Sequence, residues 1–187
     1  MIDIFLKSEA HFTTKSYFKI PQYNTYYTKH PDGNAHAGAA VVVRQTISHY
    51  ELPKYEEDFL QATSIRVRTV SYELTVSAVY SPLKYTLKKD QYAPFISTLG
   101  PRFMAGGDYN SKHTAWGSRI STTKGRELFS LLQENNYSSS STGNPTNWPT
   151  DPTKQPDLLD FFATNGISST YTDIEPSYDL SSDHSPS

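Results

Sequence analysis

The stretch of residues 103–118, FMAGGDYNSKHTAWGS, constrains the fold of this chain more than any other. A short apolar run meets two glycines and then an Asp-Tyr-Asn sequence. The pattern predicts a buried strand that stops at the glycines and leaves the next side chains at the edge of a sheet. Residues two apart project to the same side of an extended chain, so Asp108 and Asn110 can hold a water beside a phosphate. For the tetrapeptide alone, a polar turn without function is the favoured interpretation, because short motifs match by chance.

Length and composition predict one domain over residues 1–187. A chain of 187 residues is long enough for a sizeable core. Hydrophobic residues make up 36% and charged residues 19%, which argues against disorder as a global state. The 14 tyrosines and 9 phenylalanines favour strands as the elements that build the core.

The charge and the cysteine count exclude several classes of protein. The formal net charge is −2, so a DNA-processing enzyme of this kind needs a local basic rim or bound metal cations. There are no cysteines, which excludes disulfides, thiolate catalysis and cysteine-rich zinc sites and fits the cytoplasm or the nucleus. No apolar stretch approaches the length of a membrane span, and the N-terminus lacks the pattern of a secretory signal.

Hydrophobic periodicity predicts more strands than helices. Strands are expected at residues 2–6, 39–44, 64–70, 72–80, 103–105 and 157–164, with an irregular edge strand or loop at 17–28 and a loop at 30–38. The segments 64–70 and 72–80 are expected to form a hairpin. Helices are expected at 88–99 and 121–136. Helices that fall between strands predict an α+β fold in which two sheets carry helices outside them.

Candidate site residues lie where the apolar strands end. Glu9 offers carboxylate oxygens, which suit magnesium or manganese. Tyr80 can donate its hydroxyl to a phosphate oxygen. His184 can exchange a proton near neutral pH, with Asp183 or another acid as its carboxylate partner. For each of these residues taken alone, an ordinary solvated or packing role is the favoured interpretation.

Asp160 differs because it stands inside the apolar run LLDFF. A buried carboxylate needs a partner, and both a polar network at a functional site and a structural bond to the backbone satisfy that need. The candidate residues are more informative together than singly. They comprise several carboxylates, one Asn and one His, and no phosphate-binding glycine loop accompanies them. This combination indicates metal-assisted phosphodiester chemistry.

The order of the motifs SEAHF, AVYSP, GGDYN, LLDFF and SSDHS resembles the endonuclease/exonuclease/phosphatase superfamily. Three longer segments are more specific: GGDYNSKHTAWGSR, TTKGRELFSLL and GNPTNWPTDPTKQPDLLDFF. They resemble the apurinic-like endonuclease domain of jockey-type non-LTR retrotransposons. The resemblance covers residues 2–187 and implies a DNase I-like fold, a four-layer α/β/β/α sandwich.

The resemblance also implies an activity and a set of roles. Such domains use Mg²⁺, with Mn²⁺ as the alternative, to nick one strand of target DNA, and a reverse-transcriptase domain of the same polyprotein extends the freed 3′-hydroxyl. Glu9 and Asp183 match metal-site residues, and His184 matches the residue that contacts the phosphate. Asp108 matches the residue that orients or deprotonates the attacking water or assists the leaving group. Asn110 matches a ligand of a phosphate oxygen.

Four further positions match the family, and a fifth candidate comes from its place in the sequence. Tyr80 matches the Tyr that lies near the scissile phosphate, and Asp160 matches the Asp of a strand often written Ile-Asp-Tyr. Thr146 and Ser182 are weaker matches to residues near the DNA. His113 lies close to the Asp-Tyr-Asn motif in sequence and is expected to contact the substrate.

The chain also departs from the pattern of the relatives. They carry an N-terminal strand with an Asn before the Glu strand and a final strand after the Asp-His loop. The first and last core strands are therefore expected to be missing here, which would expose strand edges. Ala10 stands where many relatives have Thr.

These observations favour a magnesium-dependent DNA endonuclease domain. A non-catalytic remnant or DNA-binding fragment of such an element is the alternative, and its support is the missing strands and the net charge of −2. An enzyme acting on small phosphoesters is a third hypothesis, against which the KHTAWGSR segment argues.

Overall fold

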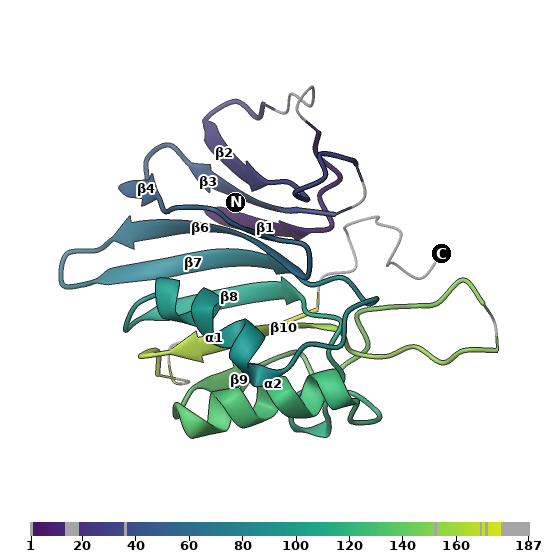
Figure 1. Ribbon diagram of the computed structural model, residues 1–187. Helices are drawn as coiled ribbons and strands as arrows, with labels where there is room; N and C mark the ends of the chain where they lie inside the picture. Colours follow the sequence, from purple (N-terminus) through teal and green to yellow (C-terminus); the bar gives the residue numbers. More distant parts are fainter. Residues whose placement is uncertain are drawn as a thin grey trace.

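The computed structural model describes residues 2–13, 19–35, 37–151, 153–168, 170 and 172–176. Two sheets and a group of helices form its layers (Figure 1). The small sheet has the order β1-β3-β2, and the large one the order β4-β6-β7-β8-β10-β9, with β5 paired to β6. The small-sheet strands are β1 Ile4–Ser8, β2 Tyr23–Thr28 and β3 Ala39–Arg44.

The large sheet is mixed. Its strands are β4 His49–Glu51, β5 Tyr55–Glu57, β6 Leu60–Arg68, β7 Glu73–Tyr80, β8 Phe103–Asp108, β9 Ser138–Ser140 and β10 Asp160–Asn165. Strands β6 and β7 form the predicted hairpin, and the predicted edge position of β2 is also confirmed. Strands β7 and β8 run parallel, while the other pairs are antiparallel. Strands β4, β5 and β9 have three residues each and were not predicted, because periodicity needs a longer run.

Alternation along β6 and β7 divides the core in two. Ile65, Val76 and Ala78 face the small sheet and pack with residues of β3. Ala62 and Val79 point the other way and pack against the helices. Successive side chains of a strand point to opposite faces, so one sheet supplies both cores. The predicted α+β sandwich is therefore confirmed.

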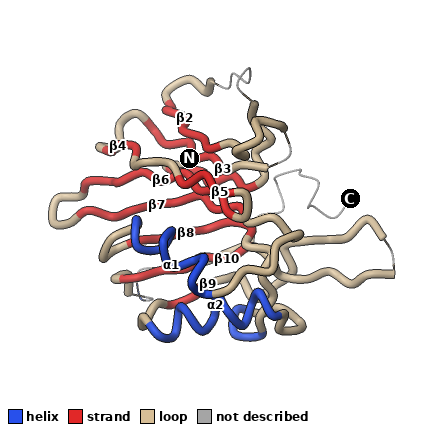
Figure 2. The backbone as a smooth tube through the Cα atoms, in the orientation of Figure 1, coloured by secondary structure: helices blue, strands red, loops and turns tan. Residues whose placement is uncertain are grey.

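Both predicted helices are present, and each lies within two residues of its expected ends. Helix α1 spans Lys89–Thr98 and α2 spans Thr123–Glu134. Thr122 caps α2, since its hydroxyl accepts the Gly125 N–H at 3.1 Å. Figure 2 shows these helices beside the large sheet and away from β2 and β3. Neither described helix is long and apolar enough to cross a membrane.

The strand predicted to stop at two glycines continues through both of them. Strand β8 runs to Asp108 because β7 and β10 pair with it on both sides. A Cβ at Gly106 would collide with the ring of Phe162, so the glycines make room for neighbours rather than end the strand. The strand predicted at residues 2–6 is likewise shifted, since pairing of Ser8 with Ala39 extends β1.

Candidate functional site

Three polar side chains lie in a row across neighbouring strands of the large sheet. In the register of the sheet, Tyr80 at the end of β7 pairs with Asp108 at the end of β8. Asp108 in turn pairs with Asp160, the first residue of β10. The parallel β7–β8 pair and the antiparallel β10 therefore bring these three side chains together at one end of the large sheet, where the strands begin or stop. Asp160 is half-buried at a strand start, so the interpretation of it as a residue in the middle of a buried strand was wrong.

Glu9 joins this row from the small sheet. It follows β1 directly and has a left-handed backbone with φ of 50°. The Tyr80 hydroxyl donates to Glu9 Oε1 at 3.2 Å. The residue before it, Ser8, connects the two sheets: its hydroxyl donates to the Val79 carbonyl at 2.7 Å and accepts the Asp108 N–H at 2.9 Å. The position of Glu9 is thus fixed relative to β7 and β8.

Gly107 makes this connection between the sheets possible. Its φ is 144°, and a Cβ on it would collide with the Val79 carbonyl oxygen and the Ser8 hydroxyl. Only a residue without a side chain lets Ser8 come this close to β8. The second glycine of the motif is therefore required by the inter-sheet contact immediately behind Asp108.

Asp108 and Asn110 do not lie on an extended chain as predicted. Asn110 has φ of 46°, so the chain turns after the strand. Its backbone N–H donates to Asp108 Oδ1 at 2.7 Å, and its side-chain amide donates to Oδ2 at 2.8 Å. Between them, Tyr109 is buried and stacks on Phe161. Both oxygens of the Asp108 carboxylate are consequently oriented by one residue.

The electrostatic environment of Asp108 favours its neutral form. The side chain is 6% exposed. Burial raises the pKa of Asp108 well above its ordinary value, the negative charges of Asp160 and Glu9 add to this, and the Asn110 N–H and Lys124 oppose it. Burial and the charges of Glu9 and Asp108 also raise the pKa of Tyr80. A carboxyl group with a raised pKa in such a cluster is typical of groups that exchange protons in catalysis.

Lys124 is a site residue that the sequence did not indicate. It lies in the first turn of α2 and is 5% exposed. Its Nζ donates to the carbonyls of Ser81 at 3.2 Å and Pro82 at 3.0 Å, directly after Tyr80. A lysine near the start of an amphipathic helix gives no sequence signal of burial, because most such lysines are solvated.

Thr146 lies beside the start of β10. Its hydroxyl accepts the N–H groups of Leu159 and Asp160, both at 3.0 Å. The loop that carries it folds back on itself through the Asn147–Asp157 bridge and projects from the body of the domain (Figure 1). The loop is also held by Lys112, whose Nζ is 2.9 Å from Asp157 Oδ2, an ion pair that sequence reasoning missed.

His113 has a structural environment. Its ring stacks on Phe129 with a centroid distance of 4.2 Å, and its Nδ1 accepts the Ala115 N–H at 3.1 Å. Burial, followed by the charge of Arg126, lowers the pKa of His113. Its predicted contact with the substrate stays a prediction. Three further predicted residues, Ser182, Asp183 and His184, lie outside the described residues.

The described side chains are compatible with a magnesium site of a particular kind. No group of three or more carboxylate or histidine side chains among the described residues is placed to hold a metal ion. Mg²⁺ is commonly held by one or two carboxylates together with waters and substrate phosphates. Glu9, fixed by Tyr80 and half-buried beside the Asp108 carboxylate, fits that type of donor set.

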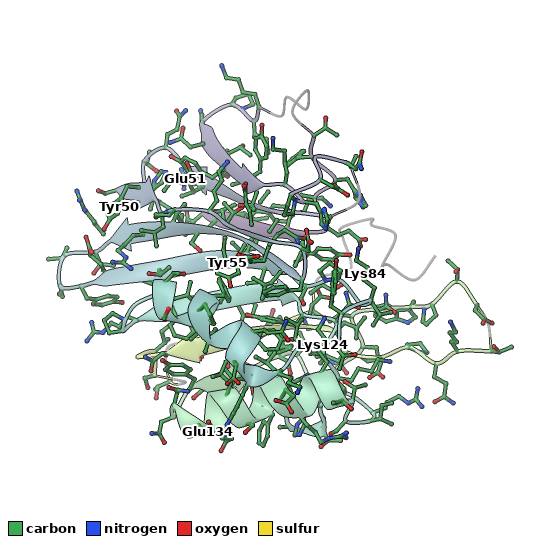
Figure 3. All side chains as sticks on the ribbon, viewed as in Figure 1. Tyr50, Glu51, Tyr55, Lys84, Lys124 and Glu134 are labelled. Carbon is green, nitrogen blue, oxygen red and sulfur yellow. The ribbon has the colours of Figure 1, made fainter. Side chains whose placement is uncertain are left out.

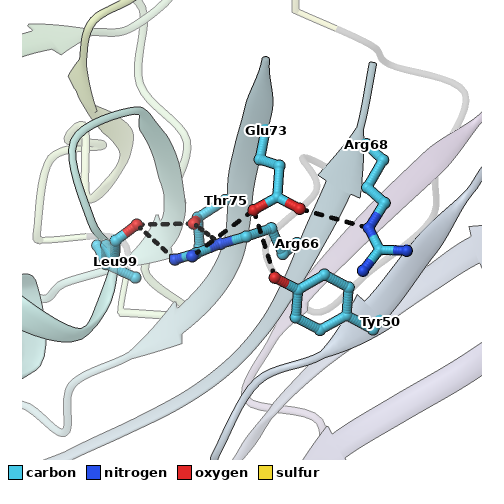
Figure 4. A network of polar contacts seen from close by, with 6 residues as sticks. All are labelled: Tyr50, Arg66, Arg68, Glu73, Thr75 and Leu99. Carbon is cyan, nitrogen blue, oxygen red and sulfur yellow. Dashed lines mark hydrogen bonds and ion pairs between the residues drawn. The ribbon is translucent and has the colours of Figure 1, made fainter. Parts of the chain in front are cut away.

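A second polar network lies at the opposite end of the large sheet. It joins Arg66, Arg68 and Glu73 of the β6–β7 hairpin to Tyr50 and to the C-terminal end of α1 (Figure 4). Beside it is a cavity of about 360 Å³, lined in part by Tyr72, Leu99 and Arg102. Acidic and basic groups are paired here, and none of the predicted site residues lies in this network.

Comparison with known proteins agrees with the geometry. The model of the family described as endonuclease–reverse transcriptase matches residues 74–187. The RNA-directed DNA polymerase from mobile element jockey of Drosophila funebris is 34% identical over 185 residues, which cover 99% of this chain and 20% of that protein. The probable RNA-directed DNA polymerase from transposon BS of Drosophila melanogaster is 32% identical over 187 residues, 21% of its length. The chain thus spans about a fifth of these relatives.

Solved structures show the same fold. The endonuclease domain of TRAS1, a telomere-specific non-LTR retrotransposon, aligns with a TM-score of 0.74 at 21% identity, covering 88% of this chain and 78% of that one. The AP endonuclease LMAP from Leishmania major aligns with a TM-score of 0.61 at 10% identity, covering 88% and 70%. The DNase I-like sandwich is thereby confirmed. The chain belongs to the endonuclease–reverse transcriptase family of the endonuclease/exonuclease/phosphatase superfamily.

Proposed function

We propose that this chain is the target-nicking endonuclease domain of a retrotransposon polyprotein. It hydrolyses one phosphodiester bond of DNA and leaves a 3′-hydroxyl, which a reverse-transcriptase domain elsewhere in the polyprotein extends. The observation that carries the proposal is the row of Tyr80, Asp108 and Asp160 beside Glu9, with a raised pKa at Asp108. Support comes from relatives that are named RNA-directed DNA polymerases of mobile elements. Acting on DNA, the domain is proposed to work in the nucleus or the cytoplasm.

In the proposed mechanism Asp108 is the general base. Once ionised, it takes a proton from the attacking water, and its burial and acidic neighbours make it a stronger base than a surface carboxylate. Asn110 orients both oxygens of Asp108, and the second hydrogen of its amide is available to a phosphate oxygen. Tyr80 holds Glu9, and His184 is proposed to stabilise the charge on the phosphate.

Glu9, together with Asp183, is proposed to hold Mg²⁺, with Mn²⁺ as the alternative. When bound, the ion would supply Lewis-acid stabilisation of the negative charge on the phosphate and the leaving oxygen. His113, Thr146 and Ser182 are proposed to contact the DNA. Thr146 is the best supported of these, since its hydroxyl bonds place it next to Asp160.

Nicking of supercoiled plasmid in the presence of Mg²⁺ tests the proposal. The wild-type chain is expected to convert the plasmid to open circles, and Asp108→Ala to lose at least about a hundredfold in rate, the usual contribution of a general base. Glu73→Gln, in the network at the opposite end of the sheet, is the matched carboxylate control and should nick at the wild-type rate.

Plasmid binding, measured by gel shift with EDTA, separates the two hypotheses. If wild type binds DNA in EDTA but does not nick it when Mg²⁺ is supplied, the chain is a DNA-binding fragment and the catalytic proposal fails. Equal nicking by wild type and Asp108→Ala would also contradict it.

A further inference from the structure

Lys124 is a buried cation immediately behind the row of polar side chains. It projects from the first turn of α2 toward the turn that follows β7 (Figure 3). Its side chain is 5% exposed, although Lys is among the residues most rarely buried. The first turn of a helix also disfavours a positive charge, because the helix dipole is positive there. Neither burial nor helix position accounts for a lysine at this point, so the reason must lie in what it contacts.

The contacts of Lys124 are two backbone carbonyls and a nearby carboxylate. Two hydrogens of its ammonium group are used by Ser81 and Pro82. Burial lowers the pKa of Lys124 to about 8, and the negative charge of Asp108 opposes that change. The hydrogen bonds to the two carbonyls place the ammonium group directly behind the turn that follows Tyr80.

The turn held by Lys124 is the one that aligns Tyr80 with Asp108. The Ser81 N–H donates to the Asp108 carbonyl at 2.9 Å, and the Ser81 hydroxyl donates to the Phe59 carbonyl at 2.9 Å. Through its hydrogen bonds to the Ser81 and Pro82 carbonyls, Lys124 also ties this turn to α2. A movement of the turn would carry Tyr80, and with it the hydrogen bond to Glu9, away from Asp108.

We infer that Lys124 is a positioning residue of this site, which fixes the turn after β7 and thereby the position of Tyr80 relative to Asp108. The inference rests on the proposed nicking activity for its kinetic consequence, although its effect on the turn can be measured without activity. The competing explanation is a purely structural clamp, in which Lys124 satisfies two carbonyls and has no effect on nicking by the folded protein.

The kinetic test compares three variants of the full 187-residue chain. Lys124→Met keeps the length of the side chain but removes the charge and the donors. It is expected to lower kcat for nicking by about tenfold to a hundredfold, the usual cost of a small misplacement of catalytic groups, with KM for the plasmid nearly unchanged. Lys124→Arg, which keeps charge and donors, should recover part of the loss. Lys89→Met removes an exposed lysine that bonds Glu134 of α2 and should match wild type.

The effect on kcat in the folded protein separates positioning from a structural clamp. A clamp without a positioning role would lower the stability of the fold and leave kcat of the folded protein unchanged. A folded Lys124→Met with wild-type kcat would therefore overturn the inference.

A measurement that needs no activity covers the case in which Lys124→Met does not fold. Amide hydrogen exchange of metal-free protein follows the Ser81 N–H, which donates to the Asp108 carbonyl. Its exchange is expected to be faster in Lys124→Met, or in Lys124→Arg where Lys124→Met does not fold, than in Lys89→Met. Equal exchange contradicts the inference even if the chain nicks DNA. Failure of wild type to nick, with faster exchange in the variant, contradicts only the proposed function.

Discussion

Charged side chains are arranged in opposite ways at the two ends of the large sheet. At the end formed by Tyr80, Asp108 and Asp160, carboxylates lie close to one another and raise the pKa of Asp108. At the other end, Glu73 lies between arginines: Arg68 Nε is 3.3 Å from Glu73 Oε1, and Arg66 Nη1 is 4.0 Å from Oε2 (Figure 4).

The difference distinguishes functional from structural polar clusters. Like charges in a buried site lower the stability of the fold, and a protein keeps them where the chemistry needs them. Paired charges at a half-exposed sheet end contribute little in either direction. The end with unfavourable electrostatics, rather than the end with the cavity and the paired charges, is therefore the better candidate for catalysis.

The largest expected difference concerns one glycine at each end. Gly107→Ala should destabilise the fold by more than about 3 kcal/mol, because the backbone conformation and a collision with the Val79 carbonyl act together. At the other end, Gly100 has φ of 76°, and a Cβ on it would meet the movable Arg66 guanidinium at 3.1 Å. Gly100→Ala should cost about 1–2 kcal/mol. Urea unfolding of both variants measures this, and equal losses would contradict the account of β8.

Hydroxyl deletions give the next largest contrast. Ser8→Ala leaves the Asp108 N–H without its acceptor and should cost about 1–3 kcal/mol. It should also slow nicking, since Glu9 is the adjacent residue. Thr75→Val removes a bond to the Leu99 carbonyl, which Arg66 still contacts at 3.4 Å, and should cost about 1 kcal/mol with nicking unchanged. If Ser8→Ala nicks normally, the inter-sheet contact does not position Glu9.

Stability against pH should change in opposite directions for two buried aspartates. The folded-state pKa of Asp108 is raised, so the stability it contributes at low pH is lost as pH rises through that value. The stability of Asp108→Asn relative to that of wild type should therefore increase as pH rises from about 4. Burial raises the pKa of Asp157, but hydrogen bonds from Arg119, Lys112 and Leu158 lower it overall. The stability contributed by Asp157 is thus present above the ordinary Asp pKa and lost as pH falls.

Urea midpoints across a pH series, in EDTA, test this contrast. Asp157→Asn should be less stable than wild type at neutral pH, and that deficit should shrink in acid. Parallel curves for Asp108→Asn and Asp157→Asn would show that the two carboxyl groups share one electrostatic environment.

The smallest effect is expected at the paired end. Arg68→Met removes the closer partner of Glu73, and because Arg68 is 61% exposed the loss should stay below about 1 kcal/mol and disappear in high salt. Thermal unfolding at low and high salt measures it. A larger loss that persists in salt would mean that this network stabilises the fold more than its exposure suggests.

Much of the architecture could be predicted from the chain alone. The hairpin, both helices and the central strands followed from apolar periodicity. Boundaries were less predictable: pairing partners carried β8 through Gly106 and Gly107 and extended β1 to Ser8. A strand ends where its neighbours stop pairing with it, and that depends on residues far away in sequence.

The sequence by itself determined which residue types stand at the strand ends, and the order of its motifs determined the family. Only the tertiary structure decided that Tyr80, Asp108 and Asp160 share one row, that Ser8 connects the sheets behind it and that Lys124 is buried beside it. The physical reason is that burial and Coulomb interactions depend on distance in space, whereas periodicity records distance along the chain. The GGDYN motif marks where the site is; its electrostatics come from β1, β10 and α2.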